Sequence, residues 1–251
     1  MENKQIIYYK QLNSTNIKMD ELATEGAAHG TVVVAETQLA GKGRRGRSWE
    51  SPAGDNIYMS VLLRPELTPQ EAPMLTLVMA YSVAKAIQKR GAFEVQIKWP
   101  NDLVISGKKV CGILTEMRLS DTTIDYVVVG VGVNVNTEDF SEELQDKATS
   151  LYLECGQKTE REIIIQDIVT IFWEEYAHFM RKRDLSFLQD EYNAMLINRE
   201  REVRVLEPGN EYTAYAIGIN RTGELLVKTE DGREKNIYAG EVSVRGVYGY
   251  V

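Results

Sequence analysis

Three strand-forming runs between residues 103 and 136 are joined by connections too short for a parallel crossover. The runs 103–105 and 109–111 flank Ser106 and Gly107, a typical hairpin turn, and a third run covers 125–136. A parallel connection needs about a dozen residues or more, so these strands must be antiparallel neighbours. This section therefore predicts a mainly antiparallel sheet, and the helical segments on either side of it in the chain predict an α+β domain.

Local signals also place the elements around this sheet. Runs rich in β-branched and apolar residues predict strands over 31–35 and 56–63. Two capping boxes, at 68–71 and 159–162, open segments in which apolar residues recur at helical spacing. The first segment runs to Ile87, with Gly91 at its expected end, and the second runs to Phe179. We therefore expect two long amphipathic helices packed on the sheet.

The character of the chain changes near residue 201. Short alternating runs at 202–206, 212–219, 224–229, 234–238 and 242–245 are separated by turn signals rich in Gly, Asn, Asp and Pro. Five short strands within about fifty residues predict a small β-barrel. We divide the chain into a catalytic or ligand-binding domain over 1–197 and a barrel domain over 198–251.

Composition excludes several classes of protein. Lys and Arg number 29 against 37 Asp and Glu, and the net charge of −8 argues against a chain built mainly to hold nucleic acid. The two cysteines, Cys111 and Cys155, form no C-x-x-C motif, and the two histidines, His29 and His178, cannot build a histidine-rich metal centre. No signal peptide and no membrane-spanning run is visible, so we expect a cytoplasmic protein.

The densest chemical feature is the glycine- and arginine-rich segment 41–47. Its spacing satisfies G-x-G-x-x-G, but residues 47–52 lack the helical period that a dinucleotide-binding fold requires after this motif. Glycines between cations make a flexible loop that suits a phosphate ligand, because guanidinium groups pair bidentately with phosphate oxygens. A solvated basic loop, or one that touches nucleic acid, is the alternative.

A second cluster is the string Lys98-Trp99-Pro100-Asn101-Asp102, followed by Lys109. With Ser106 and Gly107 at the turn, Val104 pairs with Lys109, and Asp102 becomes its diagonal neighbour on the same face. A carboxylate and an ammonium group would then lie together at a place where an anion is bound and an amine is received. The alternative is a structural turn before a strand.

Two further motifs could have either a structural role or a ligand-binding role. The run 130–136 carries glycines inside a strand, which indicates either a β-bulge or the close approach of another group. The triplet Ser14-Thr15-Asn16 follows the first strand, and its simplest role is to cap a helix.

In combination, these motifs resemble those of the biotin protein ligases. The matching segments are Ser14-Thr15-Asn16, Glu36-Thr37-Gln38, Gly41 to Arg47 with Trp49, Lys98 to Leu103, Lys109 with Gly112 to Leu114 and Glu116, Gly130 with Gly132 and Asn134, and Gly240 to Arg245. The resemblance implies a catalytic domain like that of class II aminoacyl-tRNA synthetases with a mainly antiparallel sheet, plus a small C-terminal SH3-like β-barrel. It also implies ATP and Mg²⁺, biotin as the substrate, and a lysine of a biotin carboxyl carrier protein as the acceptor.

The resemblance also bears on partners. Because the match begins at residues 6–9, it implies the ligase-only type without an N-terminal DNA-binding domain, and no DNA and no membrane are expected as partners. The oligomeric state stays open between a monomer and a homodimer.

Roles for individual residues follow from the resemblance alone. It places biotin, or the adenylate made from it, at Ser14, Thr15, Asn16, Gln38, Gly41, Lys42, Gly43, Arg44, Lys109 and Gly112. It places ATP at Arg44, Arg47, Asn134 and Arg245, and it makes Lys109, Arg44 and Asp102 the catalytic residues, with Asp102 at the acceptor amine. Lys42 stands where the family usually has an arginine, and it keeps the charge without the bidentate fork. The Mg²⁺ ligands and the adenine-stacking residue stay unassigned.

Three rival functions remain. A lipoate or octanoate protein ligase would share the fold but is expected to carry a different loop in place of residues 41–47. A non-catalytic nucleic-acid-binding module would use the basic loop and bind duplexes with a steep salt dependence. A dehydrogenase would follow from the G-x-G-x-x-G spacing and would change the absorbance of a nicotinamide cofactor.

Overall fold

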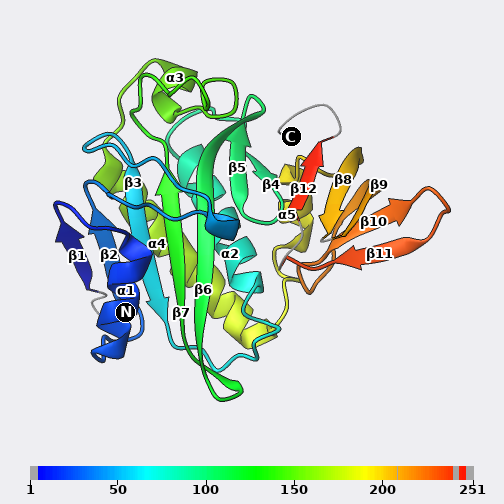
Figure 1. Cartoon of the computed structure of the whole chain (residues 1–251), viewed down its shortest axis with the longest axis horizontal. Helices are drawn as coiled ribbons and strands as arrows, with labels where there is room; N and C mark the ends of the chain where they lie inside the picture. Colours follow the sequence, from blue (N-terminus) through cyan, green and yellow to red (C-terminus); the bar gives the residue numbers. More distant parts are fainter. Residues whose placement is uncertain (1–4, 208, 240–242, 247–251) are drawn as a thin grey trace.

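A seven-stranded sheet forms the centre of the computed structural model, which describes residues 5–207, 209–239 and 243–246 (Figure 1). Its strands are β1 (Ile6–Tyr9), β2 (Val32–Ala35), β3 (Ile57–Leu63), β4 (Gln96–Lys98), β5 (Asp102–Ile105), β6 (Lys108–Ser120) and β7 (Thr123–Val133), in the order β1-β2-β3-β7-β6-β5-β4. Only the pairing of β1 with β2 is parallel among these strands. The antiparallel arrangement predicted for residues 103–136 is therefore confirmed, and β6 and β7 pair over almost their whole length.

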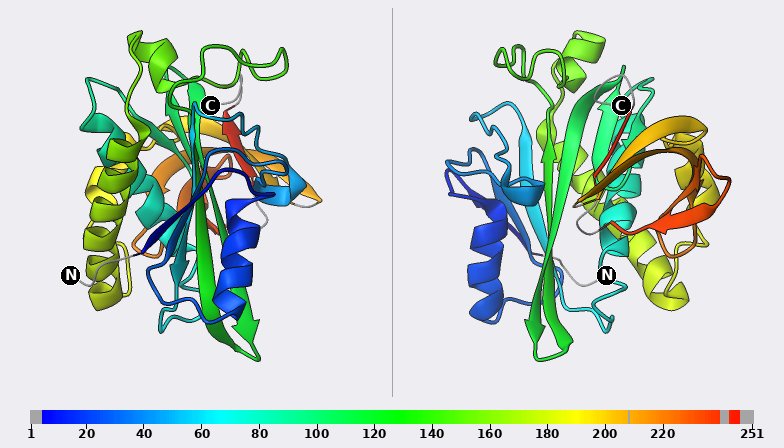
Figure 2. Two further views of the ribbon diagram at one scale, coloured as in Figure 1. Left: turned by 90° about the vertical axis from the view of Figure 1, so that its left-hand side faces the viewer. Right: turned by 45° about the vertical axis from the view of Figure 1, so that its right-hand side comes forward.

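Helices cover the two faces of this sheet. Helix α1 (Thr15–Thr24) lies on one face, and α2 (Met74–Gln88) with α4 (Arg161–Lys182) lies on the other (Figure 2). Helix α2 is buried almost all around because it lies between the sheet and α4. The short helices α3 (Leu151–Cys155) and α5 (Gln189–Met195) were not predicted.

Both long helices start later than the capping boxes predict. Only one of the two capping-box contacts forms at Thr68, whose backbone N–H donates to Glu71 Oε2 at 2.7 Å. Its hydroxyl donates to the same oxygen at 2.8 Å, and the Glu71 N–H donates to the Thr68 carbonyl at 3.0 Å, which closes a turn. Helix α2 begins at Met74 because Pro73 disfavours helical backbone at the residue before it, and it ends at Gln88, before Gly91. Helix α4 begins at Arg161.

The hydrophobic core lies on both sides of the sheet. The larger cluster fills the space between the sheet, α2 and α4. A smaller cluster packs Met19 of α1 against Val33, Leu62 and Val128 on the opposite face. Burial of these apolar side chains, at roughly 25 cal/mol per Å² removed from water, fixes α1 and hence the residues at its N-terminus.

The C-terminal part of the chain forms a separate five-stranded antiparallel sheet. Its strands are β8 (Arg201–Glu207), β9 (Asn210–Ile219), β10 (Leu225–Thr229), β11 (Glu234–Ile237) and β12 (Ser243–Gly246), in the order β11-β10-β9-β8-β12. The five predicted strands are confirmed, apart from the stretch 240–242, which lies outside the described residues. Buried residues of this sheet join the larger core cluster, so the two parts share one core.

Within the described ranges, no helix has both the length and the apolar content that would let it cross a bilayer.

Candidate active site

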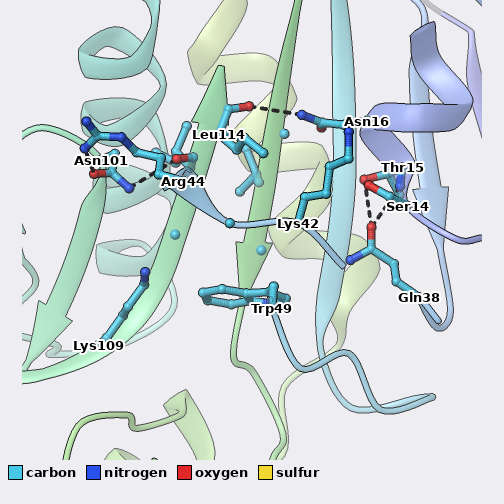
Figure 3. A pocket seen from close by; sticks show the side chains of 16 residues that line it. Ser14, Thr15, Asn16, Gln38, Lys42, Arg44, Trp49, Asn101, Lys109 and Leu114 are labelled. Atoms are coloured by element: carbon cyan, nitrogen blue, oxygen red, sulfur yellow. Dashed lines mark hydrogen bonds between the residues drawn. The ribbon is translucent and has the colours of Figure 1, made fainter. Parts of the chain in front are cut away.

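A cavity opens on the sheet face that carries α1 (Figure 3). Four parts of the chain build it: the N-terminus of α1, the loop between β2 and β3, the turn before β5, and strands β6 and β7. The residues that line it are Ser14, Thr15, Asn16, Gln38, Lys42, Gly43, Arg44, Trp49, Asn101, Lys109, Gly112, Ile113, Leu114, Gly130, Val131 and Gly132. Most of the predicted substrate residues therefore meet at one place.

Glycines in the two central strands make room for side chains that lie flat on the sheet. A Cβ atom at Gly130 would come within 2.1 Å of Asn16 Oδ1, and one at Gly132 would come within 2.6 Å of the Trp49 ring. Gly112 faces the same ring, with its ideal Cβ position 2.8 Å away. Of the two alternatives for the glycines of the run 130–136, a β-bulge or the close approach of another group, the second is therefore correct.

Trp49 is a pocket residue that the sequence motif includes but to which the sequence assigned no role. Its indole lies over the two strands, and Lys109 Nζ lies 5.1 Å from its ring centroid, which is a cation–π distance. Its Nε1 is buried and has no hydrogen-bond partner among the described residues, so it can serve a ligand oxygen. The signal that could have found it is the strip of bare glycines, which requires something large to cover it.

One end of the cavity is neutral and polar. The Thr15 backbone N–H donates to Gln38 Oε1 at 2.8 Å, and Gln38 Nε2 donates to Ser51 Oγ at 2.9 Å. Ser14 takes the N-cap position of α1 with extended backbone, but its hydroxyl makes no cap bond to the helix. The triplet therefore starts the helix, as its simplest role predicts, and also lines the cavity.

The other end carries charge. Lys109 Nζ lies 2.7 Å from Asp102 Oδ1, and Val104 pairs with Lys109, both as the hairpin geometry predicts. Asn101 Nδ2 donates to the same carboxylate oxygen at 2.9 Å. The string Lys98-Trp99-Pro100-Asn101-Asp102 thus supplies a second site residue, Asn101, in addition to Asp102.

The loop 41–47 brings Arg44 against this charged end (Figure 3). Its guanidinium donates to Asn101 Oδ1 at 2.6 Å and to the Ala239 carbonyl at 2.8 Å, so the C-terminal sheet domain also touches the site. Burial lowers the pKa of Arg44, and Asp102 partly opposes this effect. The segment after the glycines forms a short 3₁₀ turn at Arg44–Gly46, not a long helix, and the neighbouring strands β2 and β3 are antiparallel. The dinucleotide-binding interpretation is excluded on both counts.

Positive charge exceeds negative charge around the charged end. Burial lowers the pKa of Lys98 to about 8; Asp102 opposes this shift, and the neighbouring cations add to it. Those cations are Lys109, Arg245 and Arg47, which come from three different segments. A cluster of mutually repelling cations in a chain of net charge −8 is typical of a site for an anionic ligand.

Five predicted residues are not among those that line the cavity: Gly41, Arg47, Asp102, Asn134 and Arg245. Asp102 contacts the lining residues Lys109 and Asn101. A Cβ atom at Gly41 would lie 2.4 Å from the Trp49 carbonyl oxygen, so this glycine lets the loop fold back on itself. Asn134 is buried, and its Nδ2 donates to the Thr149 carbonyl at 3.1 Å. Arg47 and Arg245 are exposed but lie within electrostatic range of Lys98.

Within the described part of the chain, no three Asp, Glu, His or Cys residues come together in a way that could hold a metal ion.

Family models match both parts of the chain. The model described as the biotin/lipoate A/B protein ligase family matches residues 8–134, and the biotin protein ligase C terminal domain matches residues 200–245. The chain is 38% identical over 243 residues to the bifunctional ligase/repressor BirA of Bacillus subtilis, which covers 95% of this chain and 74% of that relative. It is 32% identical over 245 residues to the biotin--[acetyl-CoA-carboxylase] ligase of Paracoccus denitrificans, covering 93% of this chain and 98% of that relative.

A solved structure shows the same fold over nearly the whole chain. The biotin protein ligase from Aquifex aeolicus in complex with biotin and ATP superimposes with a TM-score of 0.84 at 33% identity, covering 97% of this chain and 99% of that one. Together with the two family-model matches and the identity to BirA, this shows that the chain belongs to the biotin protein ligases.

Proposed function

We propose that this ligase activates biotin with ATP to biotinyl-5′-AMP and then transfers biotin to a lysine of a biotin carboxyl carrier protein. The observation that carries the proposal is the polarity of the cavity. Its neutral end, at Thr15 and Gln38, suits a ureido ring, and its cationic end, at Lys109 and Arg44, suits a carboxylate beside a triphosphate.

The first step needs charge neutralisation and positioning. A carboxylate oxygen of biotin attacks the α-phosphorus, the bond from that phosphorus to the bridging oxygen breaks, and pyrophosphate leaves. Biotin's carboxylate is already ionised near neutral pH, so no general base is required. Lys109 and Arg44 bring positive charge to the reacting groups, while Arg47 and Arg245 lie where they can attract the phosphates.

Mg²⁺ fits this site as a companion of ATP. Mg²⁺ usually keeps few protein ligands and binds substrate phosphates, which agrees with the lack of a metal cage among the described residues. When bound, it neutralises phosphate charge. Asp102, whose Oδ1 lies 2.7 Å from Lys109 Nζ at the charged end, is the carboxylate that we assign to support it.

The second step transfers the acyl group to an amine. The lysine nitrogen of the carrier attacks the carbonyl carbon of the mixed anhydride, the bond from that carbon to the phosphate oxygen breaks, and AMP leaves. We assign Asp102 to orient the incoming amine and to accept its proton, because Asp102 already holds one ammonium group at 2.7 Å. The loop 41–47 keeps water from the anhydride.

Two features favour biotin over a lipoyl or octanoyl group. A ureido ring offers one carbonyl and two N–H groups, which match the hydrogen-bonding residues at the neutral end, whereas a dithiolane or an alkyl chain offers none. The match of residues 200–245 to a domain described for biotin protein ligases supports the same choice.

We also propose that the boundary between the catalytic domain and the C-terminal domain lies between residues 197 and 198. Helix α5 ends at Met195 and β8 begins at Arg201, so this short connection is the natural place for it.

The test is a labelling assay on the full chain. Incubation with biotin, Mg·ATP and a carboxyl carrier domain should attach biotin to one carrier lysine and release AMP and pyrophosphate in equal amounts. A carrier in which that lysine is replaced by arginine should stay unlabelled. Labelling with lipoate or octanoate at least as fast as with biotin would overturn the assignment of the substrate.

A further inference from the structure

Glu116 of β6 contacts both the cavity and the loop above it. Its Oε2 accepts a hydrogen bond from Asn16 Nδ2 at 2.7 Å, and its Oε1 lies 3.6 Å from Lys42 Nζ. The geometry points to Glu116 as a positioning residue for biotin: it sets the direction of the hydrogen bonds at the neutral end of the cavity. This inference rests on the proposed function, which places the ureido ring at that end.

The side-chain amide of Asn16 is buried beside the cavity. Its nitrogen faces two groups that can only accept, the Glu116 carboxylate at 2.7 Å and the Leu114 carbonyl at 3.3 Å. If the amide were flipped, its oxygen would face both of these oxygens, and its nitrogen would turn from them to the Ser60 hydroxyl, which lies 2.6 Å from the present Oδ1. A charged acceptor makes the stronger of the two bonds, so Glu116 does most to hold the amide in one orientation.

The fixed amide determines the next two hydroxyl groups. Ser60 Oγ lies 2.6 Å from Asn16 Oδ1 and 2.8 Å from Thr15 Oγ1. Because an amide oxygen can only accept, the single hydroxyl hydrogen of Ser60 goes to Asn16. The hydroxyl hydrogen of Thr15 then goes either to Ser60 Oγ or to Gln38 Oε1, which lies 3.2 Å from Thr15 Oγ1.

This relay leaves acceptors facing the cavity. Both possible acceptors of the Thr15 hydrogen belong to the protein, so the lone pair of Thr15 Oγ1 that faces the cavity can only accept, and Gln38 Oε1 is held by the Thr15 backbone N–H at 2.8 Å. The second lone pair of Asn16 Oδ1 is also an acceptor. A ligand end that carries N–H groups, as a ureido ring does, meets a surface that is already oriented to receive them.

The contact with Lys42 contributes less to this arrangement. The two side chains are 43% and 45% exposed and 3.6 Å apart, and exposed ion pairs of this kind stabilise weakly. The bond to Asn16 is therefore the part to test, and Gln is the conservative variant because it keeps an acceptor oxygen without the charge.

The experiment measures biotin and ATP binding separately, by calorimetry, for the wild type and three variants. Glu116→Leu removes the acceptor, and Glu116→Gln retains one. Glu138→Leu is the matched control, since Glu138 is an exposed glutamate that pairs with Lys158 at 2.8 Å, outside the residues that line the cavity. We expect biotin to bind Glu116→Leu at least about tenfold more weakly, the scale of a buried donor that loses a charged acceptor. Glu116→Gln and the control should stay within about threefold of wild type, and ATP should bind all four proteins alike.

The outcomes separate the two proposals. Biotin affinity of Glu116→Leu equal to wild type would overturn the positioning role while leaving the proposed function intact. Equal loss in Glu116→Leu and Glu116→Gln would also overturn it, because the acceptor oxygen would then not matter. Loss of ATP binding together with biotin binding would indicate general misfolding and count against the inference. Failure of the wild type to bind biotin would overturn the proposed function, and this inference with it.

Discussion

Lys109 and Arg44 approach the charged end of the cavity from opposite sides, and each has a distinct set of partners. Lys109 is held by Asp102 and by the face of Trp49, and both contacts keep its ammonium group in place. Arg44 reaches the same end from the loop, where it bonds Asn101 and the backbone of Ala239. We therefore expect loss of Lys109 to affect mainly adenylate formation and loss of Arg44 to affect mainly retention of the adenylate.

Replacement of Lys109 by alanine should slow adenylate formation by about 10²-fold or more, the effect of removing one donor to a developing charge. The measurement is pyrophosphate release with biotin and ATP. Lys108→Ala is the matched control. Lys108 directly precedes Lys109 in the hairpin, and its Nζ donates to the Gln145 backbone carbonyl at 2.9 Å. Normal pyrophosphate release by Lys109→Ala would leave Lys109 only a structural role in the hairpin.

Replacement of Arg44 by glycine should still allow adenylate formation but release the adenylate early, because Lys109 stays in place while the grip of the loop is lost. Biotin should then appear on lysines of a bystander such as albumin, detected by a biotin blot. The control is Arg45→Gly, since Arg45 has φ 58°, a conformation that glycine adopts without strain. A bystander no more labelled by Arg44→Gly than by wild type, with adenylate still made, would show that Arg44 does not retain the intermediate.

At the scale of elements, the site depends on a cationic loop laid over a strip of glycines. Gly43 and Arg44 line the cavity, Arg45 and Arg47 point to solvent, and Lys42 bridges at the surface to β6. A loop with alternating glycines and cations should be held more firmly once an anion lies beneath it, because the anion neutralises the repulsion between the cations.

Protease accessibility tests this coupling. Trypsin should cut after Arg45 and Arg47 in the free protein, and biotin with Mg·ATP should slow cutting at both positions by about tenfold or more, the effect of stabilising the closed loop by about 1.4 kcal/mol. Cleavage after Arg233, in an exposed turn of the C-terminal domain, supplies the internal control. Equal cutting of the loop with and without ligands would contradict closure over the adenylate.

How far the sequence predicts this site depends on how local each feature is. The contact of Asp102 with Lys109 could be predicted because a two-residue turn sets the register of the hairpin. Trp49 and Glu116 could not be assigned roles, because their contacts depend on which strands become neighbours and on how a loop folds across them. The helix starts were placed too early because a capping box can close a turn without continuing into a helix, as at Thr68.

At the scale of the whole molecule, the C-terminal sheet is tied to the catalytic part through the string before β5. The indole of Trp99 is 1% exposed, its Nε1 donates to the Gly223 carbonyl at 3.0 Å, and its backbone N–H donates to Asn198 Oδ1 at 2.9 Å. The string that carries Asp102 therefore also carries the anchor between the two sheets. This role of Trp99 could not be predicted from the sequence, because its two hydrogen-bond partners lie about a hundred residues or more further along the chain.

Replacement of Trp99 by phenylalanine should lower the free energy of unfolding by about 2–4 kcal/mol, since it leaves the Gly223 carbonyl unpaired and a void beside the ring. Urea unfolding followed by circular dichroism is the measurement. One transition is expected for wild type and variant, because the two parts share a core. Two separate transitions in the wild type, with Trp99→Phe changing neither midpoint, would contradict the shared core.

On the proposed function, one cavity makes a biotinyl-adenylate and then passes its biotin to a carrier lysine. The most direct measurement is a single-turnover time course with α-labelled ATP, quenched and separated at each time point. Labelled biotinyl-adenylate should appear first and only when biotin is present, and on addition of the carrier domain it should decay to labelled AMP at the rate at which biotinylated carrier forms. Carrier biotinylation that proceeds without any adenylate, or adenylate that fails to discharge to the carrier, would contradict the account.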